Sequence, residues 1–350
     1  MIFRQLFDQV SSTYTYLLAD EATREAILLD CVFEEHERDR ALVRELELNL
    51  TCVVDSHCHA DHVTGAWLMK RALGCQVALS PAYGAKNVDR PLSHGDEIVF
   101  GSHVLEVRAT PGHTDGCLSF ASRDSARVFT GDALLVRGAG RTDFQKGSAR
   151  TLYRSIQEQL FSLPDDWQVY PAHDYEGRTS STIGEERRYN PRIGAAAREE
   201  DFVGYMENLG LPHPKQLAVA LPANLRSGEP EDGRVPTHSD WAPLVMTYGG
   251  ISEVDPEWVA KHKADIHLLD VRGTAEWDGE LGHLEGAQLI PLDELRARLA
   301  EVPMDRPIVT VCQTGKRSAL ATTILKKAGV PRTANVSGGM LRWRQLGLPS

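Results

Sequence analysis

Six consecutive residues, His-Cys-His-Ala-Asp-His at positions 57–62, constrain the fold of this chain more than any other feature. They bring three imidazoles and one carboxylate together directly after an apolar segment, residues 51–55, whose pattern is that of a buried strand. Because alternate residues of an extended segment point the same way, His57 and His59 can converge on one point. Neutral imidazoles and carboxylates are the ligands that borderline divalent metals prefer. A polar surface turn, or histidines buried in a core, would not need this density of ligands, so the motif predicts a metal site.

Three later segments repeat the pattern of a short strand, a turn and a ligand-type side chain. His113 follows a predicted strand at residues 104–107, and Asp132 and His173 end the segments 127–132 and 168–173. A sheet can gather distant residues at one edge when each residue follows the end of a strand. The sequence therefore predicts that these side chains join the histidine motif.

The set of possible ligands does not determine which metal binds or which reaction the site catalyses. One ion could bind to His57, His59, His113 and Asp132, and a second to Asp61, His62, His173 and Asp132. Two zinc ions on the full set would support a hydrolase in which a bridging hydroxide attacks an ester or thioester. Two histidines and one carboxylate would instead suit a single iron with open positions for O2 and a thiolate.

Length and composition narrow the class of protein. A chain of 350 residues is longer than one hydrophobic core usually organises, so two domains are expected. The formal net charge of −11 argues against nucleic acid or an anionic membrane as a partner. No apolar run approaches the roughly 20 residues of a membrane span, and the N-terminus lacks the layout of a signal peptide. The six cysteines have no paired spacing, which favours a reducing, cytoplasmic location.

Hydrophobic periodicity places regular elements around the metal motif. The predicted elements are a hairpin of strands 13–19 and 26–30 and helices over residues 36–48, 64–73 and 184–208, the last one despite Asn190-Pro191. A succession of strands and helices that also contains an antiparallel hairpin indicates a mixed α/β domain.

The composition and the hydrophobic periodicity of the sequence change near residue 228. A polar segment with turn-forming residues follows, and residues 229–250 are predicted to form a linker. Beyond it, strands at 267–271, 288–291, 307–312 and 334–336 alternate with helices at 255–263, 292–300 and 317–328 and a last short helix. This alternation predicts a small βαβ domain with a parallel sheet.

The chemistry of this second domain lies in Cys-Gln-Thr-Gly-Lys-Arg-Ser, residues 312–318, between a strand and a helix. In such a loop, successive backbone N–H groups surround one point and the helix N-terminus adds positive potential. Lys316 and Arg317 add full charges, so Cys312 should be a reactive thiolate. Rhodaneses and cysteine phosphatases both use such loops. This loop is one residue shorter than in related phosphatases, which favours a single sulfur atom over a phosphate group.

The N-terminal motifs resemble those of the metallo-β-lactamase superfamily over roughly residues 10–225, and more narrowly those of the ethylmalonic-encephalopathy-type persulfide dioxygenases. The resemblance is carried by HCHADHVTG (57–65), TPGHTDGCLSF (110–120), FTGDALLVRGAGRTDFQ (129–145), YPAHDYEGRTSSTIGEERRYNPR (170–192) and LPANLRSG (221–228). It implies an αββα sandwich as the fold of this domain.

The same resemblance implies roles for individual residues. One Fe(II) per chain would bind to His57, His113 and Asp132. Four further polar residues would lie around the metal without binding it, namely His59, Asp61, His62 and His173. A glutathione-type substrate would contact Arg141, Tyr175 and Arg192. The alternative is that these arginines form surface ion pairs and that the tyrosine packs in the core.

The C-terminal segment resembles a single rhodanese domain over about residues 250–350. The motifs are LLDVRGTAEWDGELGHLEGAQLIPL (268–292) and VSGGMLRWRQLGLP (336–349). The resemblance implies that Cys312 carries a sulfane sulfur, that Lys316 and Arg317 assist catalysis, and that the substrate contacts Gln313, Thr314, Gly315 and Ser318. A salt link between Asp270 and Arg272 is expected to stabilise this domain.

Together these features predict a fusion of a persulfide dioxygenase domain (1–228) and a rhodanese domain (251–350). Cys312 would transfer sulfane sulfur from thiosulfate to glutathione, and the first domain would oxidise glutathione persulfide with O2 to sulfite and glutathione. These small molecules are the expected partners, and a homodimer is left open. The alternative function is a dizinc thioesterase of the glyoxalase II type with an appended sulfurtransferase, although its helical thioester-binding segment has no obvious counterpart in the sequence.

Overall fold

A computed structural model of the protein describes residues 1–212, 214–236 and 239–349. The chain forms two compact units, Met1–Val235 and Pro236–Ser350, and each is described by itself. The division falls within residues 229–250, for which the sequence predicts a linker.

The first sheet of the N-terminal unit contains the predicted hairpin and the strand that precedes the histidine motif. Its strands, in spatial order, are β1 (Ile2–Asp8), β2 (Thr13–Ala19), β3 (Glu25–Leu29), β4 (Asn49–Val54), β5 (Gln76–Leu79) and β6 (Arg90–Pro91). The pairs among β1, β2 and β3 are antiparallel, and those from β3 to β6 are parallel. Helices α1 (His36–Glu45) and α2 (Ala66–Leu73) connect the parallel strands, as crossover connections require.

The second sheet holds the strands that precede the other predicted ligands. Its order is β14 (Ser181–Thr182), β13 (Gln168–Pro171), β10 (Arg127–Gly131), β9 (Leu118–Ser122), β8 (His103–Ala109) and β7 (Glu97–Phe100). Only β10 and β13 pair in parallel, with Phe129 opposite Tyr170. Asp132 and His173 therefore emerge from neighbouring strands at the same edge of the sheet.

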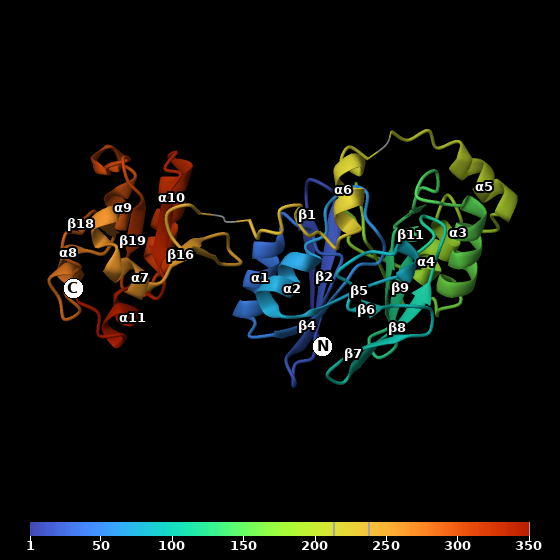
Figure 1. Ribbon diagram of the computed structural model, residues 1–350, viewed down its shortest axis with the longest axis horizontal. Coiled ribbons are helices and arrows are strands. Elements are labelled where there is room, and N and C mark those ends of the chain that lie inside the picture. The colour runs from blue at the N-terminus through green and yellow to red at the C-terminus, as the bar shows by residue number, and fades with distance from the viewer. Residues whose placement is uncertain (213, 237–238, 350) are drawn as a thin grey trace. The chain divides into compact units, whose positions relative to one another are not determined.

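Helices cover the outer faces of both sheets, so the unit is a four-layer αββα sandwich (Figure 1). Leu18 packs between the sheets, while its neighbour Leu17 faces the other way and packs with Leu42 of α1. On the outer face of the second sheet, Val169 packs in one cluster with Phe202 of α5 (Glu199–Glu207). Each fully buried leucine or phenylalanine contributes about 1.5–3 kcal/mol, and this burial holds the layers together. The predicted fold is confirmed.

The remaining elements of this unit are short. They are β11 (Leu134–Leu135), β12 (Gly138–Ala139), the 3-10 turn η1 (Pro81–Tyr83), α3 (Ala149–Ser155) with its π-helical continuation η2 (Ile156–Leu160), α4 (Ile183–Tyr189) and α6 (Leu217–Asn224). The predicted single helix over 184–208 is wrong, because α4 ends at Tyr189 and α5 begins at Glu199. Asn190 has an extended ψ of 120°, as expected for a residue that precedes a proline.

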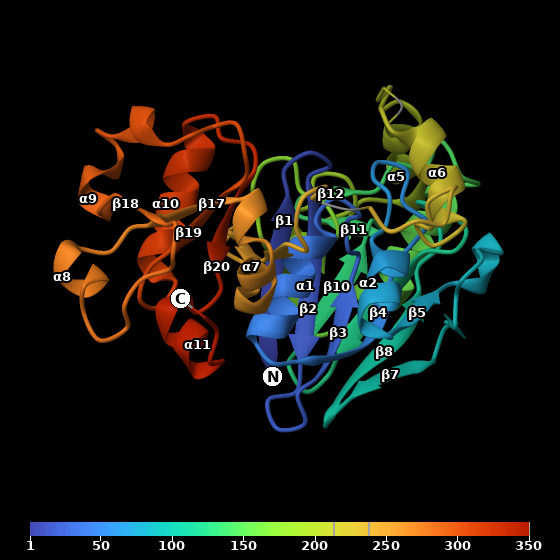
Figure 2. The ribbon, with the colours of Figure 1, turned by 60° about the vertical axis from the view of Figure 1, so that its left-hand side comes forward.

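The C-terminal unit is a mostly parallel sheet with helices on both faces (Figure 2). The strand order is β15 (Val245–Met246), β16 (Ser252–Val254), β20 (Thr333–Val336), β19 (Ile308–Val311), β17 (His267–Asp270) and β18 (Gln288–Leu289), and only the β15–β16 pair is antiparallel. The helices and turns are α7 (Pro256–Lys261), η3 (Lys263–Asp265), α8 (Thr274–Trp277), α9 (Leu292–Leu295), η4 (Leu299–Glu301), α10 (Lys316–Lys327) and α11 (Gly339–Gln345).

Two hydrophobic clusters flank this sheet. Trp343 of α11 and Val259 of α7 pack on one face, and Leu325 of α10 and Leu295 of α9 pack on the other. β15 lies inside the segment that the sequence predicts to be a linker. Among the described residues of the whole chain, no helix is long and apolar enough to cross a membrane.

Candidate functional site

The N-terminal unit gathers the predicted ligands into two adjacent clusters. The first contains His57, His113 and Asp132, whose ligand atoms all lie within 4.8 Å of one another. Each of these residues follows the end of a strand: β4, β8 and β10, respectively. The two sheets therefore bring one ligand set together from three segments that are distant in the sequence.

The two histidines of the first cluster face the same carboxylate oxygen of Asp132. Oδ2 of Asp132 lies 3.6 Å from Nε2 of His113 and 3.9 Å from Nε2 of His57. The two imidazole rings are perpendicular, with their centroids 5.0 Å apart. All three side chains are buried or nearly so. This arrangement suits one divalent ion held by two nitrogens and one oxygen, which leaves further coordination positions open.

Hydrogen bonds to the distal ring nitrogens orient these two histidines. Nδ1 of His113 donates to the carbonyl oxygen of Arg141 over 2.7 Å, so the proton is on Nδ1 and Nε2 is free as a ligand. Nδ1 of His57 lies 3.0 Å from Oγ of Ser56, and a proton on this nitrogen leaves Nε2 in the same role. Burial and the neighbouring His59 lower the pKa of His57 well below its usual value, which keeps the ring neutral.

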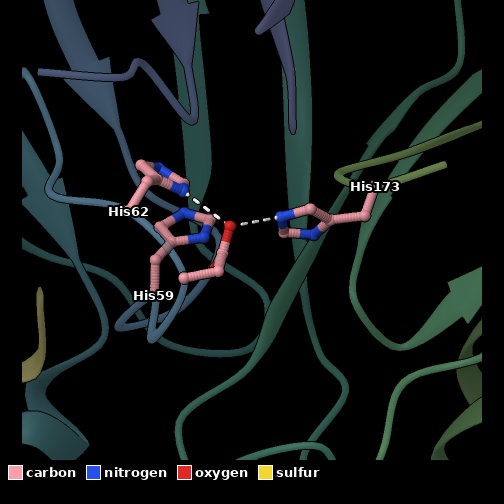
Figure 3. Close-up of side chains that lie close together, drawn as sticks. His59, His62 and His173 are labelled. Carbon is pink, nitrogen blue, oxygen red and sulfur yellow. Dashed lines mark hydrogen bonds and ion pairs between the residues drawn. The ribbon is translucent and has the colours of Figure 1, made fainter. Parts of the chain in front are cut away.

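The second cluster contains His59, Asp61, His62 and His173. Oδ2 of Asp61 lies between Nδ1 of His62, at 3.0 Å, and Nε2 of His173, at 2.8 Å (Figure 3). Oγ1 of Thr13 is 3.0 Å from the same nitrogen of His173. The polar atoms around Asp61 therefore satisfy one another, although Nδ1 of His59 and Nε2 of His62 have no hydrogen-bond partner among the described residues.

His173 joins the two clusters. Its Nδ1 donates to Oδ1 of Asp132 over 2.6 Å, while its Nε2 faces Asp61. Burial alone would lower the pKa of His173, but the two carboxylates outweigh burial and raise it well above its usual value. The hydrogen bond from Nδ1 of His173 orients the carboxylate of Asp132.

The donor sets fit a resident metal. Burial would raise the pKa of Asp132, but the protonated His173 and the hydrogen bond that it donates outweigh burial and hold this pKa well below its usual range. The first cluster thus offers an ionised carboxylate at Asp132 and a neutral imidazole at His57, which are protonation states that metal binding requires.

A buried asparagine that the sequence analysis missed holds the histidine loop in place. Nδ2 of Asn224, at the end of α6, donates to the carbonyl oxygens of His59 and His62 over 2.8 Å each. Its Oδ1 accepts a 2.8 Å hydrogen bond from the backbone of Thr64, and the side chain is only 3% exposed. The motif LPANLRSG contains this residue, but nothing in the spacing links it to the loop.

We expect Asn224→Asp to weaken metal binding about 10–100-fold, because a carboxylate cannot donate to the two carbonyls and the ligand loop loses its clamp. The measurement is metal affinity by chelator competition, together with the melting temperature of the metal-free protein. Asn190→Asp is the control, because Asn190 is equally buried but donates to the carbonyl of Gly138 over 2.9 Å. Equal metal loss in both variants would contradict a specific role for Asn224.

Two further residues missed in the sequence support the loops that carry the predicted ligands. Oδ1 of Asp30 accepts hydrogen bonds from the backbone of Ser56, at 2.6 Å, and from Nε2 of His59, at 3.1 Å. The hydroxyl of Tyr83 contacts that of Thr114, which lies next to His113. Asp30 ends the predicted strand 26–30. A ligand-type side chain at a strand end, the pattern that identified His113, Asp132 and His173, was therefore present for Asp30 as well.

The three residues expected to contact glutathione have different surroundings. Arg141 forms two 2.7 Å bonds to Asp143 and also bonds the carbonyls of Leu211 and Pro212. Arg192 donates to the carbonyl of Ala139 over 2.6 Å and lies over the ring of Tyr205. Arg141 thus forms an ion pair of the kind named in the alternative interpretation, whereas Arg192 contacts a backbone carbonyl and an aromatic ring.

Tyr175 does not pack in the core. It is 70% exposed, and its ring lies parallel to that of His173 with the centroids 6.2 Å apart. Tyr175 therefore lies at the surface beside His173.

In the C-terminal unit, Cys312 follows β19 and lies inside the loop that leads into α10. Oγ of Ser318 donates to the sulfur over 3.2 Å. Burial would raise the pKa of Cys312, but the bonds from Ser318 and from the backbone N–H groups of Thr314 and Gly315 outweigh it and lower the pKa below its ordinary value. Gln313, Thr314 and Lys316 are exposed at the loop, while Gly315 is buried with a positive φ of 89°.

The other five cysteines behave in the opposite way. All are buried and free, and burial raises the pKa of each thiol: well above the usual value for Cys31, to about 11 for Cys75, and to about 12 for Cys52, Cys58 and Cys117. Cys312 is therefore the one described cysteine with a lowered pKa.

The rate of Cys312 alkylation should consequently rise with pH along a titration curve whose midpoint lies below pH 9, the ordinary thiol pKa. The sign follows because a lowered pKa increases the thiolate fraction near neutral pH, and only the thiolate reacts. Mass spectrometry of the peptide that contains Cys312 measures this rate, and Cys75 serves as the internal control. A plateau at the same pH for both thiols would contradict the assignment.

The paired salt link that the sequence predicts is present. Nη2 of Arg272 lies 2.6 Å from Oδ2 of Asp270, and both side chains are fully buried. Arg317 forms a further ion pair with Glu276, and both of these side chains are partly exposed.

An αββα sandwich with histidines and aspartates at its strand ends defines a metallo-β-lactamase-type metalloprotein, here with a second domain that carries a cysteine loop. The family descriptions agree: residues 8–173 match the metallo-beta-lactamase superfamily and residues 255–346 match the rhodanese-like domain.

Individual relatives narrow the class. The human mitochondrial persulfide dioxygenase ETHE1 is 52% identical over 229 residues, which are 65% of this chain and 89% of the relative. The crystal structure of ETHE1 from Myxococcus xanthus is 53% identical, with a TM-score of 0.63, and covers 65% of this chain and 100% of that one. The chain belongs to the ETHE1 persulfide dioxygenase family and carries an additional C-terminal rhodanese-like domain.

A third comparison concerns the fold alone. A metallo-beta-lactamase structure from Staphylococcus aureus is 24% identical with a TM-score of 0.61, and it covers 96% of this chain and 98% of that chain. The predicted fusion is confirmed at the level of the family, and the relatives do not favour the alternative of a dizinc thioesterase.

Proposed function

We propose that the protein couples two reactions of sulfane sulfur. Cys312 of the rhodanese domain transfers sulfur from thiosulfate to glutathione, and the dioxygenase domain oxidises the resulting glutathione persulfide with O2 to sulfite and glutathione. The observation that supports this most directly is the cluster of His57, His113 and Asp132, in which His173 orients the carboxylate. Two histidines and one carboxylate suit a single non-heme Fe(II).

In this proposal, the residues of the first cluster would hold one Fe(II) per chain. When bound, the iron would supply open coordination positions for O2 and the persulfide sulfur. His173 holds Asp132 through Nδ1, and the carbonyl of Arg141 holds His113, so the ligand geometry is set before substrate arrives. Asp61, His59 and His62 surround the site without binding the metal.

Glutathione persulfide would bind beside this cluster through Arg141, Tyr175 and Arg192. Tyr175 supports the placement because it is exposed and lies parallel to His173. Arg141 is anchored beside the first cluster, because its backbone carbonyl accepts a hydrogen bond from Nδ1 of His113. A glutathione carboxylate would compete with Asp143 for the guanidinium fork of Arg141, which binds carboxylates in a bidentate manner.

Cys312 is the nucleophile of the transfer step. Its thiolate attacks the outer sulfur of thiosulfate, the S–S bond breaks, and sulfite leaves with the electron pair. The thiolate of glutathione then attacks the outer sulfur of the Cys312 persulfide, which forms glutathione persulfide and returns the Cys312 thiolate. Ser318 and the backbone N–H groups of Thr314 and Gly315 stabilise the negative sulfur.

Connecting the two domains in one chain would raise the effective concentration of the intermediate near the second site, to about the millimolar range for a short flexible linker. The free cysteines of the described residues suit a reducing compartment such as the cytoplasm, which we propose as the location.

The test combines metal analysis with oxygen uptake. Protein purified without added metal should contain about one iron per chain and should consume one O2 for each glutathione persulfide converted to sulfite. Two zinc ions with negligible iron, together with thioester hydrolysis and no oxygen uptake, would contradict the proposal.

A further inference from the structure

Of the two cations in the cysteine loop, Arg317 is already neutralised within the protein. Its Nη1 and Nη2 each donate to one carboxylate oxygen of Glu276, at 2.7 and 2.6 Å. This bidentate pairing is the strongest arrangement that a guanidinium and a carboxylate form. The charge of Arg317 is thus directed at Glu276 and not at an incoming anion.

Glu276, which is partly exposed, is held in place by hydrogen bonds that connect it to a buried ion pair. Its Oε2 accepts the backbone N–H of Gly273 at 3.3 Å, and its carbonyl accepts Nη1 of Arg272 at 3.1 Å. Arg272 is itself fully buried and paired with Asp270. The carboxylate that pairs with Arg317 therefore belongs to α8, an element outside the cysteine loop.

Lys316 differs from its neighbour. It is exposed at the first position of α10, and within the described parts of the chain its ammonium group forms no hydrogen bond or ion pair. It is therefore the loop cation that remains available to a donor molecule at Cys312.

We propose that Glu276 determines donor specificity in the sulfur-transfer loop by neutralising Arg317, so that recognition of an anionic donor depends on Lys316 and the backbone N–H groups. The inference rests on the proposed sulfur transfer at Cys312. Thiosulfate carries two negative charges, and its sulfite leaving group carries them away. A loop with one free cation binds such a dianion more weakly than a loop with two, so Glu276 restricts the affinity for thiosulfate.

The experiment compares two alkylating reagents of similar size at Cys312, the anion iodoacetate and the neutral iodoacetamide. Because both need the same access to the sulfur, the ratio of their rates reports local charge and does not require any transferase activity. Glu276→Gln should raise this ratio about two- to fivefold, and Lys316→Gln should lower it by a similar factor. The site of reaction is checked by mass spectrometry.

A matched control and a double variant separate charge from structural damage. Glu301→Gln removes the same charge from a similar fork, in which Arg298 contacts Glu301 at 2.8 and 2.7 Å, and should leave the ratio unchanged. Arg317→Gln should lower the ratio, because it leaves Glu276 unpaired, and the double variant Glu276→Gln/Arg317→Gln should restore the wild-type ratio. The double variant also provides the test if Glu276→Gln does not fold.

The kinetic arm measures thiosulfate turnover in the same variants. Glu276→Gln should lower the KM for thiosulfate and Lys316→Gln should raise it, each about two- to fivefold with kcat changed less than about twofold. A ratio in Glu276→Gln equal to that in Glu301→Gln would overturn the inference even if thiosulfate is a good donor. The expected ratios with no turnover of thiosulfate would support the role of Glu276 and contradict the proposed function.

Discussion

A Cys312→Ser enzyme is expected to lose sulfur transfer from thiosulfate to glutathione by at least about a thousandfold, while its oxygen consumption on preformed glutathione persulfide stays within about twofold. A serine hydroxyl cannot form the persulfide. The substitution hardly changes packing, and Cys312 and the metal ligands belong to different compact units of the chain. With thiosulfate and glutathione as the only substrates, the variant should consume no oxygen.

The matched control is Cys75→Ser, which makes the same replacement at a buried cysteine in the other unit. Burial raises the pKa of Cys75 to about 11, so this thiol is not a nucleophile near neutral pH, and both activities should persist. An oxygen electrode and a sulfite assay measure both reactions. An equal loss of both activities in Cys312→Ser would mean that they share one site, and normal oxygen consumption from thiosulfate would mean that Cys312 is not the carrier.

The second large effect concerns Asp132. Asp132→Ala should lose essentially all iron and all oxygen consumption, because Oδ2 of Asp132 is the one oxygen that both His57 and His113 face. His173→Ala should keep most of the iron and lower the rate about 10–100-fold, since it removes only the group that orients the carboxylate through Oδ1.

Elemental analysis and oxygen uptake distinguish these two variants. The transferase activity of Cys312 serves as the internal control and should be unchanged in both. If His173→Ala loses as much metal as Asp132→Ala, then His173 is itself a ligand. That result would favour the dinuclear alternative over the proposed single iron.

Much of this protein is determined by short-range features of its sequence. The periodicity of residues 13–19 and 51–55 was sufficient to place the strands, since alternation along a strand is local. Histidines and aspartates follow the ends of predicted strands, and the cysteine loop follows a predicted strand and precedes a predicted helix. Strand ends gather at sheet edges, so the sequence alone indicated that His57, His113, Asp132 and His173 would meet.

Only the tertiary structure shows which hydrogen bonds and ion pairs connect these residues. His173 donates to Asp132, Asn224 clamps a loop 165 residues away, and Glu276 neutralises Arg317 from 41 residues away. Periodicity and spacing describe which way a side chain points from its own element, but a hydrogen bond is decided by a few tenths of an ångström between elements. That distance depends on how sheets and helices pack, which no local pattern contains.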